Sequence, residues 1–139
     1  MAAAALTPRV RILVICDTVL PSETEQGVFT LEGVRQDVFA GVLPYHRDLS
    51  LFLFLTSPRH GKYEGWVRVI HNDSTRTIRY SPFHATFEQN HEWQSLFVEL
   101  GNCKFPQVGA YTFEVWFRAK NGEDAQKGEM PFLVLENEG

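Results

Sequence analysis

The sequence lacks the short motifs that identify the common enzyme classes. Its 139 residues contain no His-Glu-x-x-His, Cys-x-x-Cys, Gly-x-Ser-x-Gly, Gly-x-Gly-x-x-Gly or P-loop pattern, each of which would place reactive groups or phosphate-binding amides at a fixed spacing. The acidic residues are scattered, so no pair of carboxylates suited to glycoside hydrolysis can be selected. We therefore expect no catalytic residue, no metal site and no cofactor.

The sequence also lacks a long apolar run and an excess of positive charge. No apolar segment approaches the roughly 20 residues that a membrane helix needs, and Arg9 and Arg11 follow the N-terminal alanines, an order that argues against a signal peptide. The net charge is -4, whereas non-specific nucleic-acid binding needs a basic surface. We expect a cytoplasmic protein that binds neither membranes nor nucleic acids.

Cysteine is scarce, with only Cys16 and Cys103 in the chain. Two cysteines make no disulfide framework, although a single bridge between them stays open. Cys16 ends an apolar strand and is expected to be a small buried thiol. Its neighbours Ile15 and Asp17 would raise its pKa, which makes it a poor nucleophile. Asp17 is expected to cap the turn that begins at Thr18.

Five histidines are present: His46, His60, His71, His84 and His91. They show no spacing typical of a metal site. His84 and His91 flank one loop, so an enzyme or metal site centred on Cys16 or on these two histidines is kept only as a third hypothesis.

Aromatic residues are abundant, at 13% of the chain, and strands favour them. Alternating apolar patterns predict strands at residues 9–17, 27–41 with a bend at Gly33, 49–56, 63–71, 75–80, 92–100, 105–117 and 129–136. A helix over 34–40 is the alternative for part of the second segment. Turns or loops are expected at 18–26, 44–48, 57–62, 72–74 and 120–128. The pattern of residues 81–91 predicts neither a strand nor a helix.

The segment 105–117 is expected to be a central strand. Tyr111, Phe113, Val115 and Phe117 fall on one side of it, and Trp116 falls on the other. About eight short strands with no amphipathic helix predict an all-β fold, an immunoglobulin-like antiparallel β-sandwich, with a jelly roll as the runner-up. Residues 1–8 are expected to form a flexible leader and residues 9–136 a single domain.

The order of the motifs resembles the DUF6941 family. They are Cys16-Asp17 at the end of the first strand, a second strand that contains Gly33, and a late Pro106-x-x-Gly109-x-Tyr111. The resemblance covers Val10 to Leu135. It implies a small single-domain bacterial protein and brings no assigned activity, so no catalytic residue can be transferred from it.

The best functional lead is a surface. If Val67 and Val69 face the core, Trp66 and Arg68 point outward on the same strand. By the same rule Trp116 and Arg118 point outward on the central strand. Exposed tryptophans beside arginines are typical of interface hot spots, whereas in a monomer the arginine stems would shelter the indoles.

We therefore expect a non-enzymatic binding module that uses Trp66, Arg68, Trp116 and Arg118 to contact a protein partner or a second copy, as in a dimer. Strand addition at a sheet edge is a second route to such contacts. The alternative is a small-ligand or carbohydrate-binding module whose exposed aromatic residues stack on a sugar ring.

Overall fold

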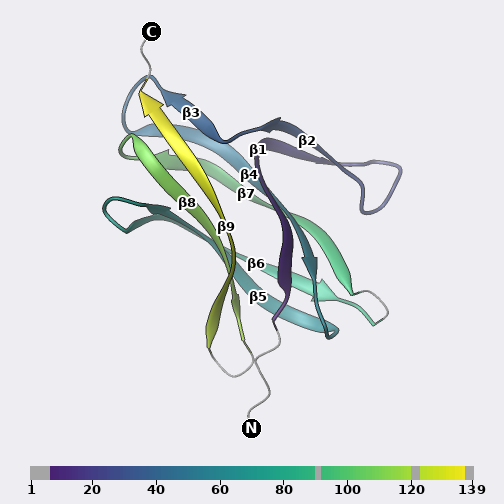
Figure 1. Cartoon of the computed structure of the whole chain (residues 1–139). Coiled ribbons are helices and arrows are strands. Elements are labelled where there is room, and N and C mark those ends of the chain that lie inside the picture. The colour runs from purple at the N-terminus through teal and green to yellow at the C-terminus, as the bar shows by residue number, and fades with distance from the viewer. Residues whose placement is uncertain (1–6, 90–91, 120–122, 137–139) are drawn as a thin grey trace.

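The computed structural model describes residues 7–89, 92–119 and 123–136. Every element in these ranges is a strand, and the nine strands form two sheets (Figure 1). Their bounds are β1 Arg9–Pro21, β2 Phe29–Val34, β3 Asp37–Ala40, β4 Tyr45–Thr56, β5 Gly61–His71, β6 Arg76–Phe87, β7 Trp93–Phe105, β8 Gly109–Arg118 and β9 Asp124–Glu136. None of the described residues forms a helix long and apolar enough to span a bilayer.

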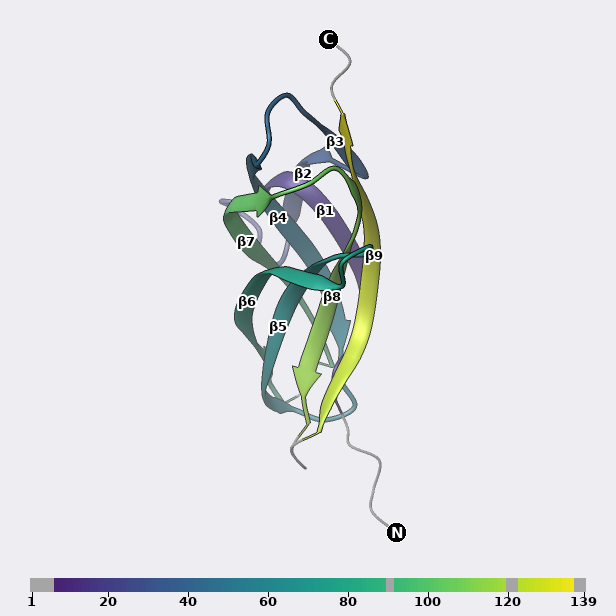
Figure 2. The same ribbon diagram turned by 90° about the vertical axis from the view of Figure 1, so that its left-hand side faces the viewer.

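One sheet has the order β2-β1-β4-β7 and the other β3-β9-β8-β5-β6. Figure 2 shows the two layers from the side, with β8 and β9 next to each other. The all-β, two-sheet architecture is confirmed, and its finer immunoglobulin-like classification stays a prediction. The described residues form nine strands where the pattern predicted about eight. One pairing differs from the antiparallel prediction, because β3 pairs with β9 in parallel.

The extra strand arises because the chain changes sheets between β2 and β3. Gly33 adopts φ +67° just before the crossing. Arg35 N then donates to Ile15 O at 2.9 Å, and Leu133 N donates to Gln36 O at 3.0 Å, so each sheet holds one end of the crossover. The bend at Gly33 was predicted correctly, whereas the helical alternative over 34–40 is wrong.

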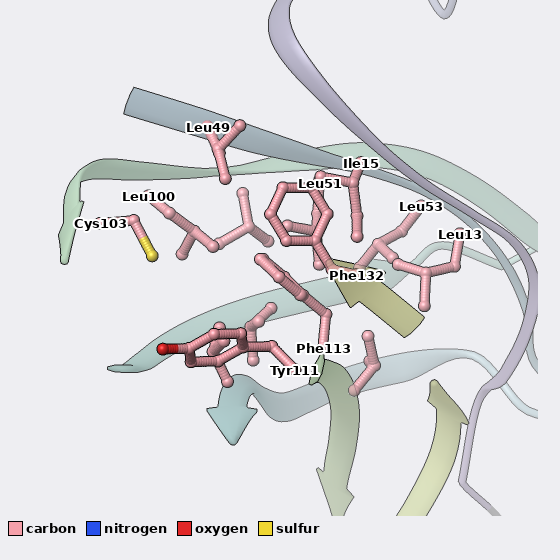
Figure 3. Packing of buried hydrophobic residues seen from close by; sticks show 14 of the residues in the cluster. Leu13, Ile15, Leu49, Leu51, Leu53, Leu100, Cys103, Tyr111, Phe113 and Phe132 are labelled. Atoms are coloured by element: carbon pink, nitrogen blue, oxygen red, sulfur yellow. The ribbon is translucent and has the colours of Figure 1, made fainter. Parts of the chain in front are cut away.

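The core lies between the two sheets and follows the predicted alternation. Leu49, Leu51, Leu53 and Leu55 of β4 are at most 1% exposed, and so are Tyr111, Phe113, Val115 and Phe117 of β8. Figure 3 shows Tyr111, Phe113 and Phe132 opposite Leu49, Leu51 and Leu100. β8 is therefore the central strand that the sequence predicted.

A tyrosine corner fixes the start of β8. The hydroxyl of Tyr111 donates to Gln107 O at 2.6 Å and accepts from Gln107 N at 3.3 Å. The chain crosses here from β7 in one sheet to β8 in the other. Such corners are typical of immunoglobulin-like sandwiches, and this one gives a physical role to the Pro-x-x-Gly-x-Tyr motif.

Several strands are longer than predicted. β1 continues to Pro21, β4 begins at Tyr45, β6 continues to Phe87, β7 ends at Phe105, and β9 begins at Asp124. The expected turn at 44–48 is therefore mostly strand, and much of the unassigned segment 81–91 belongs to β6. Residues 1–6 of the expected leader lie outside the described residues. Thr7, only 4% exposed, and Pro8 are buried, so the domain begins before Arg9.

Candidate functional site

Six side chains form a ladder on the outer face of the five-stranded sheet, where β5 and β8 run side by side. We define the aromatic–arginine ladder as Glu64, Trp66 and Arg68 of β5 with Glu114, Trp116 and Arg118 of β8. The strands are antiparallel, with Trp66 opposite Trp116 and Arg68 opposite Glu114. The alternation that buries Val67 and Val115 at 0% exposure places all six on the outer face.

The two indoles stack on each other and each is covered by an arginine from the neighbouring strand. Their ring centroids are 6.1 Å apart, with an interplanar angle of 6°. Cζ of Arg68 lies 5.2 Å from the centre of the Trp116 ring. Cζ of Arg118 lies 5.7 Å from the centre of the Trp66 ring. Both distances are within the range of a cation–π contact.

Carboxylates hold both arginines in place. Nε of Arg68 donates to Oε1 of Glu114 at 2.9 Å, and this oxygen also accepts from Nε1 of Trp116 at 2.9 Å. At the other end, Arg118 donates to Oε2 of Glu64 at 3.1 Å. Asp124 of β9 lies 3.7 Å from the Arg118 guanidinium. The ladder is thus a fixed array of charges around an aromatic centre.

The outward direction of the four predicted site residues is correct, but the predicted exposure of Trp66 is wrong. Trp66 is only 8% exposed, because Arg118 covers its ring and Tyr80 of β6 lies 6.0 Å away, centroid to centroid. Trp116 is partly buried. The arginines thus shelter the indoles, as the alternative reading of the same pattern predicted.

Sequence reasoning did not include Glu64, Glu114 or Tyr80 in the site. Glu114 and Glu64 belong to the same outward alternation as the tryptophans, so that pattern could have identified them. Tyr80 is 54% exposed and pairs with Arg68 across β5 and β6. Its contribution depends on the hairpin register, which the sequence leaves unspecified.

A second polar cluster joins β1, the β2–β3 crossover and the start of β4. Oδ1 of Asp17 accepts from Nε of Arg35 at 2.6 Å, from Nε of Arg47 at 3.1 Å and from Nη2 of Arg47 at 2.9 Å. The hydrogen bond from Arg35, together with that from Arg47, holds the pKa of Asp17 below its usual value. Asp17 therefore ties three segments together rather than capping the turn at Thr18.

Both cysteines are free and buried, so the open question of a Cys16–Cys103 bridge is answered in the negative. Burial raises the pKa of Cys16, and the charge of Asp17 raises it further. Burial raises the pKa of Cys103 to about 11. These directions disfavour a thiolate, in agreement with the argument that Cys16 is a poor nucleophile.

The histidines are dispersed. His84 lies within β6 rather than in a loop, and His91 lies outside the described residues. His71 is buried, with Nδ1 2.9 Å from Oγ of Ser74 and its ring packed on Tyr111. No group of three or more His, Cys, Asp or Glu side chains that could hold a metal ion occurs within residues 7–89, 92–119 and 123–136.

Solved structures with some similarity include three proteins of low sequence identity. Pseudomonas fluorescens alkylpurine DNA glycosylase AlkC, bound to DNA with an abasic site analog, is 14% identical at TM-score 0.48, and the match covers 88% of this chain and 30% of AlkC. CopC from Methylosinus trichosporium OB3b is 14% identical at TM-score 0.36, over 76% of this chain and 87% of CopC. The PmoD soluble domain from Methylocystis sp. is 12% identical at TM-score 0.37, over 91% and 96%. The chain thus spans under a third of the AlkC chain.

Two sequence comparisons were informative. No curated protein matches the chain significantly. The sequence model of DUF6941, a family of unknown function, matches residues 11–134. The motifs singled out above, Cys16-Asp17, Gly33 and Pro106-x-x-Gly109-x-Tyr111, all fall inside this range. Because the match extends over most of the chain, the protein belongs to the DUF6941 family.

Proposed function

We propose that this protein is a non-enzymatic binding module that associates with a second copy of itself through the aromatic–arginine ladder. The observation that supports this proposal is the arrangement of charge in the ladder. Its outer rows are Glu64 with Arg118 and Arg68 with Glu114, and its middle row is the tryptophan pair. Opposite charges thus alternate both along each strand and across the strands.

This arrangement is complementary to itself. Two copies that pack face to face are related by a two-fold axis in the plane between them. If the axis runs along the strands, the exposed Glu64 meets Arg118 of the second copy, and Arg68 lies over its mostly buried Glu114. If the axis runs across the strands, Arg68 meets Glu64 of the second copy. Both geometries bring opposite charges together and place the arginine-covered tryptophan pairs of the two copies over each other.

The size and rigidity of the face also favour association. Four neighbouring strands about 4.8 Å apart and roughly 33 Å long present about 600 Å² of projected area, close to the roughly 800 Å² of accessible surface that each partner buries in a standard interface. The ion pairs and stacked rings already hold the ladder side chains in one arrangement. Less side-chain entropy is therefore lost on binding than with mobile side chains.

The proposed location is the cytoplasm. Cys16 and Cys103 are both free thiols, and the reducing cytosol keeps thiols in that state. Because the fold contains no Cys16–Cys103 disulfide, self-association can be measured in reducing buffer, which prevents cysteine cross-links between copies.

Sedimentation velocity over a range of protein concentrations tests the proposal. We expect the wild type to dimerise and Arg118→Glu to weaken the dimer by about tenfold or more, because it places like charges in contact. Arg118 is 54% exposed at its side chain, so the substitution should leave the fold intact. Lys104→Glu, at an exposed position of β7 in the other sheet, is the matched charge-reversal control. A wild type that stays monomeric at the highest soluble concentration would overturn the proposal.

The exchanged pair Glu64→Arg/Arg118→Glu identifies the symmetry axis. It restores the ion pair within each copy. With the axis along the strands, residues 64 and 118 meet each other between copies, so the double variant should dimerise like the wild type. With the axis across the strands, residue 64 meets Arg68, so the double variant should be monomeric. A dimer that is insensitive to every one of these changes would place the interface elsewhere.

A further inference from the structure

A cleft of about 590 Å³ is lined by residues of β2 and β7 in the four-stranded sheet and by Thr86 near the end of β6 in the five-stranded sheet. It lies between the β1–β2 hairpin, which projects from the side of the sandwich in Figure 1, and Thr86, Glu88 and the first residues of β7. Its volume falls in the range of small-molecule sites. The side chains that matter for its chemistry are Gln26, Phe29, Glu88, Trp93, Gln94 and Ser95.

Two aromatic rings form the apolar walls of the cleft, and both are anchored in the outer face of the sheet. Phe29 packs on Phe52 and Phe97 of the central and edge strands, with centroid distances of 5.5 and 6.0 Å. Trp93 packs on Phe54 at 6.0 Å. Trp93 is nevertheless 55% exposed, so a large part of this side chain is accessible to solvent.

Polar groups surround these rings. Oε1 of Gln94 accepts the backbone N–H of Thr86 at 2.9 Å, which fixes the orientation of this amide at the wall of the cleft. Gln26, Ser95 and the carboxylate of Glu88 provide further donors and acceptors. Among the described residues that line the cleft there is one carboxylate and no lysine or arginine. This lining disfavours anions such as phosphates, and its polarity disfavours a purely apolar ligand.

We propose that this cleft binds a neutral oligosaccharide. A sugar ring has an apolar C–H face and a rim of hydroxyl groups. The first matches the exposed indole of Trp93, and the second matches amide, hydroxyl and carboxylate side chains arranged around it. The carboxylate of Glu88 is a strong acceptor for a sugar hydroxyl.

The space beyond Trp93 indicates a chain of sugars rather than a single ring. A second concavity of about 430 Å³ has Trp93 in its own lining, together with Arg9, Arg11 and the carboxylate-bearing Glu92. Trp93 is therefore a wall common to both spaces. A ligand longer than one ring can cross the indole, with one unit in the cleft and the next in the second concavity, where both signs of charge are present.

A glycan array that includes neutral and uronic acid-containing oligosaccharides, probed with the labelled full chain, tests the proposal. We expect signals on neutral oligosaccharides of two or more units. Calorimetry with the strongest glycan should then show at least about tenfold weaker binding for Trp93→Ala, because an aromatic anchor is lost. Phe39→Ala, which removes a ring of similar exposure (58%) on β3, is the matched control and should bind like the wild type.

A second variant tests the polar half of the site. Glu88→Gln keeps the shape of the side chain and removes its charge, and should weaken binding by about fivefold to tenfold. Thermal melts without ligand should show Trp93→Ala and Glu88→Gln folded. The proposal is overturned if no neutral glycan binds, if only acidic glycans or nucleosides bind, or if binding survives Trp93→Ala. Dimerisation through the ladder is measured separately and is independent of these outcomes.

Discussion

Asp17 and Gly33 face each other across β1 and β2 so closely that a side chain added at Gly33 would force Asp17 to shift. A Cβ atom there would lie 2.8 Å from Cγ of Asp17 and nearer still to Oδ2. Asp17 cannot easily move away, because Arg35 and Arg47 both donate to its Oδ1. The Cys-Asp pair and the glycine of the second strand are thus two halves of one contact.

Gly33→Ala should lower the free energy of unfolding by about 2–4 kcal/mol, because it combines this clash with a φ of +67°. Chemical denaturation measures the change. Gly101→Ala is the control, since nothing lies within 4 Å of its added Cβ, and its effect should stay within about 1 kcal/mol. In an Asp17→Ala background the cost of Gly33→Ala should shrink, and an unchanged cost would show that the contact is not its cause.

The Asp17 carboxylate should make stability depend on acid pH. Its pKa is lowered in the folded state by the hydrogen bonds from Arg35 and Arg47, so its contribution is present above the unfolded value of about 3.9 and is lost as pH falls through the lower folded pKa. Asp17→Asn should lower stability by about 1–3 kcal/mol at neutral pH. The difference between wild type and variant, measured by denaturation from pH 7 to pH 2.5, should shrink only at the acid end. A constant difference would contradict this linkage.

The tyrosine corner should be worth a measurable part of the stability. Tyr111→Phe removes one hydrogen bond to each of two backbone atoms of Gln107 and should lower the unfolding free energy by about 1–2 kcal/mol. Burial raises the pKa of Tyr111, so its contribution is complete below the unfolded value of about 10 and declines as pH rises above it. Tyr80→Phe, at an exposed position, should change stability by less than about 0.5 kcal/mol.

Neither thiol should react while the protein is folded. Burial raises the pKa of Cys16 and raises that of Cys103 to about 11, so both are protonated and shielded at pH 8. Titration with an aromatic disulfide reagent should label no cysteine in the native state and two after unfolding in guanidinium. Because both folded pKa values are raised, their contribution to stability is lost as pH rises above about 9. Rapid labelling of Cys16 in the native state would reopen its candidacy as a nucleophile.

Local alternation predicted the faces of β4, β5 and β8 correctly, since each buries one side of its strand against the other sheet. It did not predict that strands such as β4 extend into polar residues at their ends. Arg47 and Asp48 looked like a turn, yet Arg47 is paired with Asp17 and Oδ1 of Asp48 accepts Asn102 N at 2.6 Å. These partners are distant in sequence, so their effect on strand length cannot be read from a local pattern.

Trp66 shows the same limit at the candidate site. Its direction follows from the period of a strand, whereas its burial depends on Arg118, which comes from another strand. The cleft was not predicted for the same reason. Phe29 and Trp93 belong to segments more than 60 positions apart and become neighbours only when the β1–β2 hairpin reaches the start of β7.

The parallel pairing of β3 with β9 has a consequence for how the molecule forms. Asp37 is matched with Leu133, 96 positions later (133 − 37). Closing so large a loop costs chain entropy before the contacts between the strands can form and offset that cost. We therefore expect folding in milliseconds to seconds rather than microseconds. During synthesis β3 therefore has no strand partner on either edge until β9 has left the ribosome.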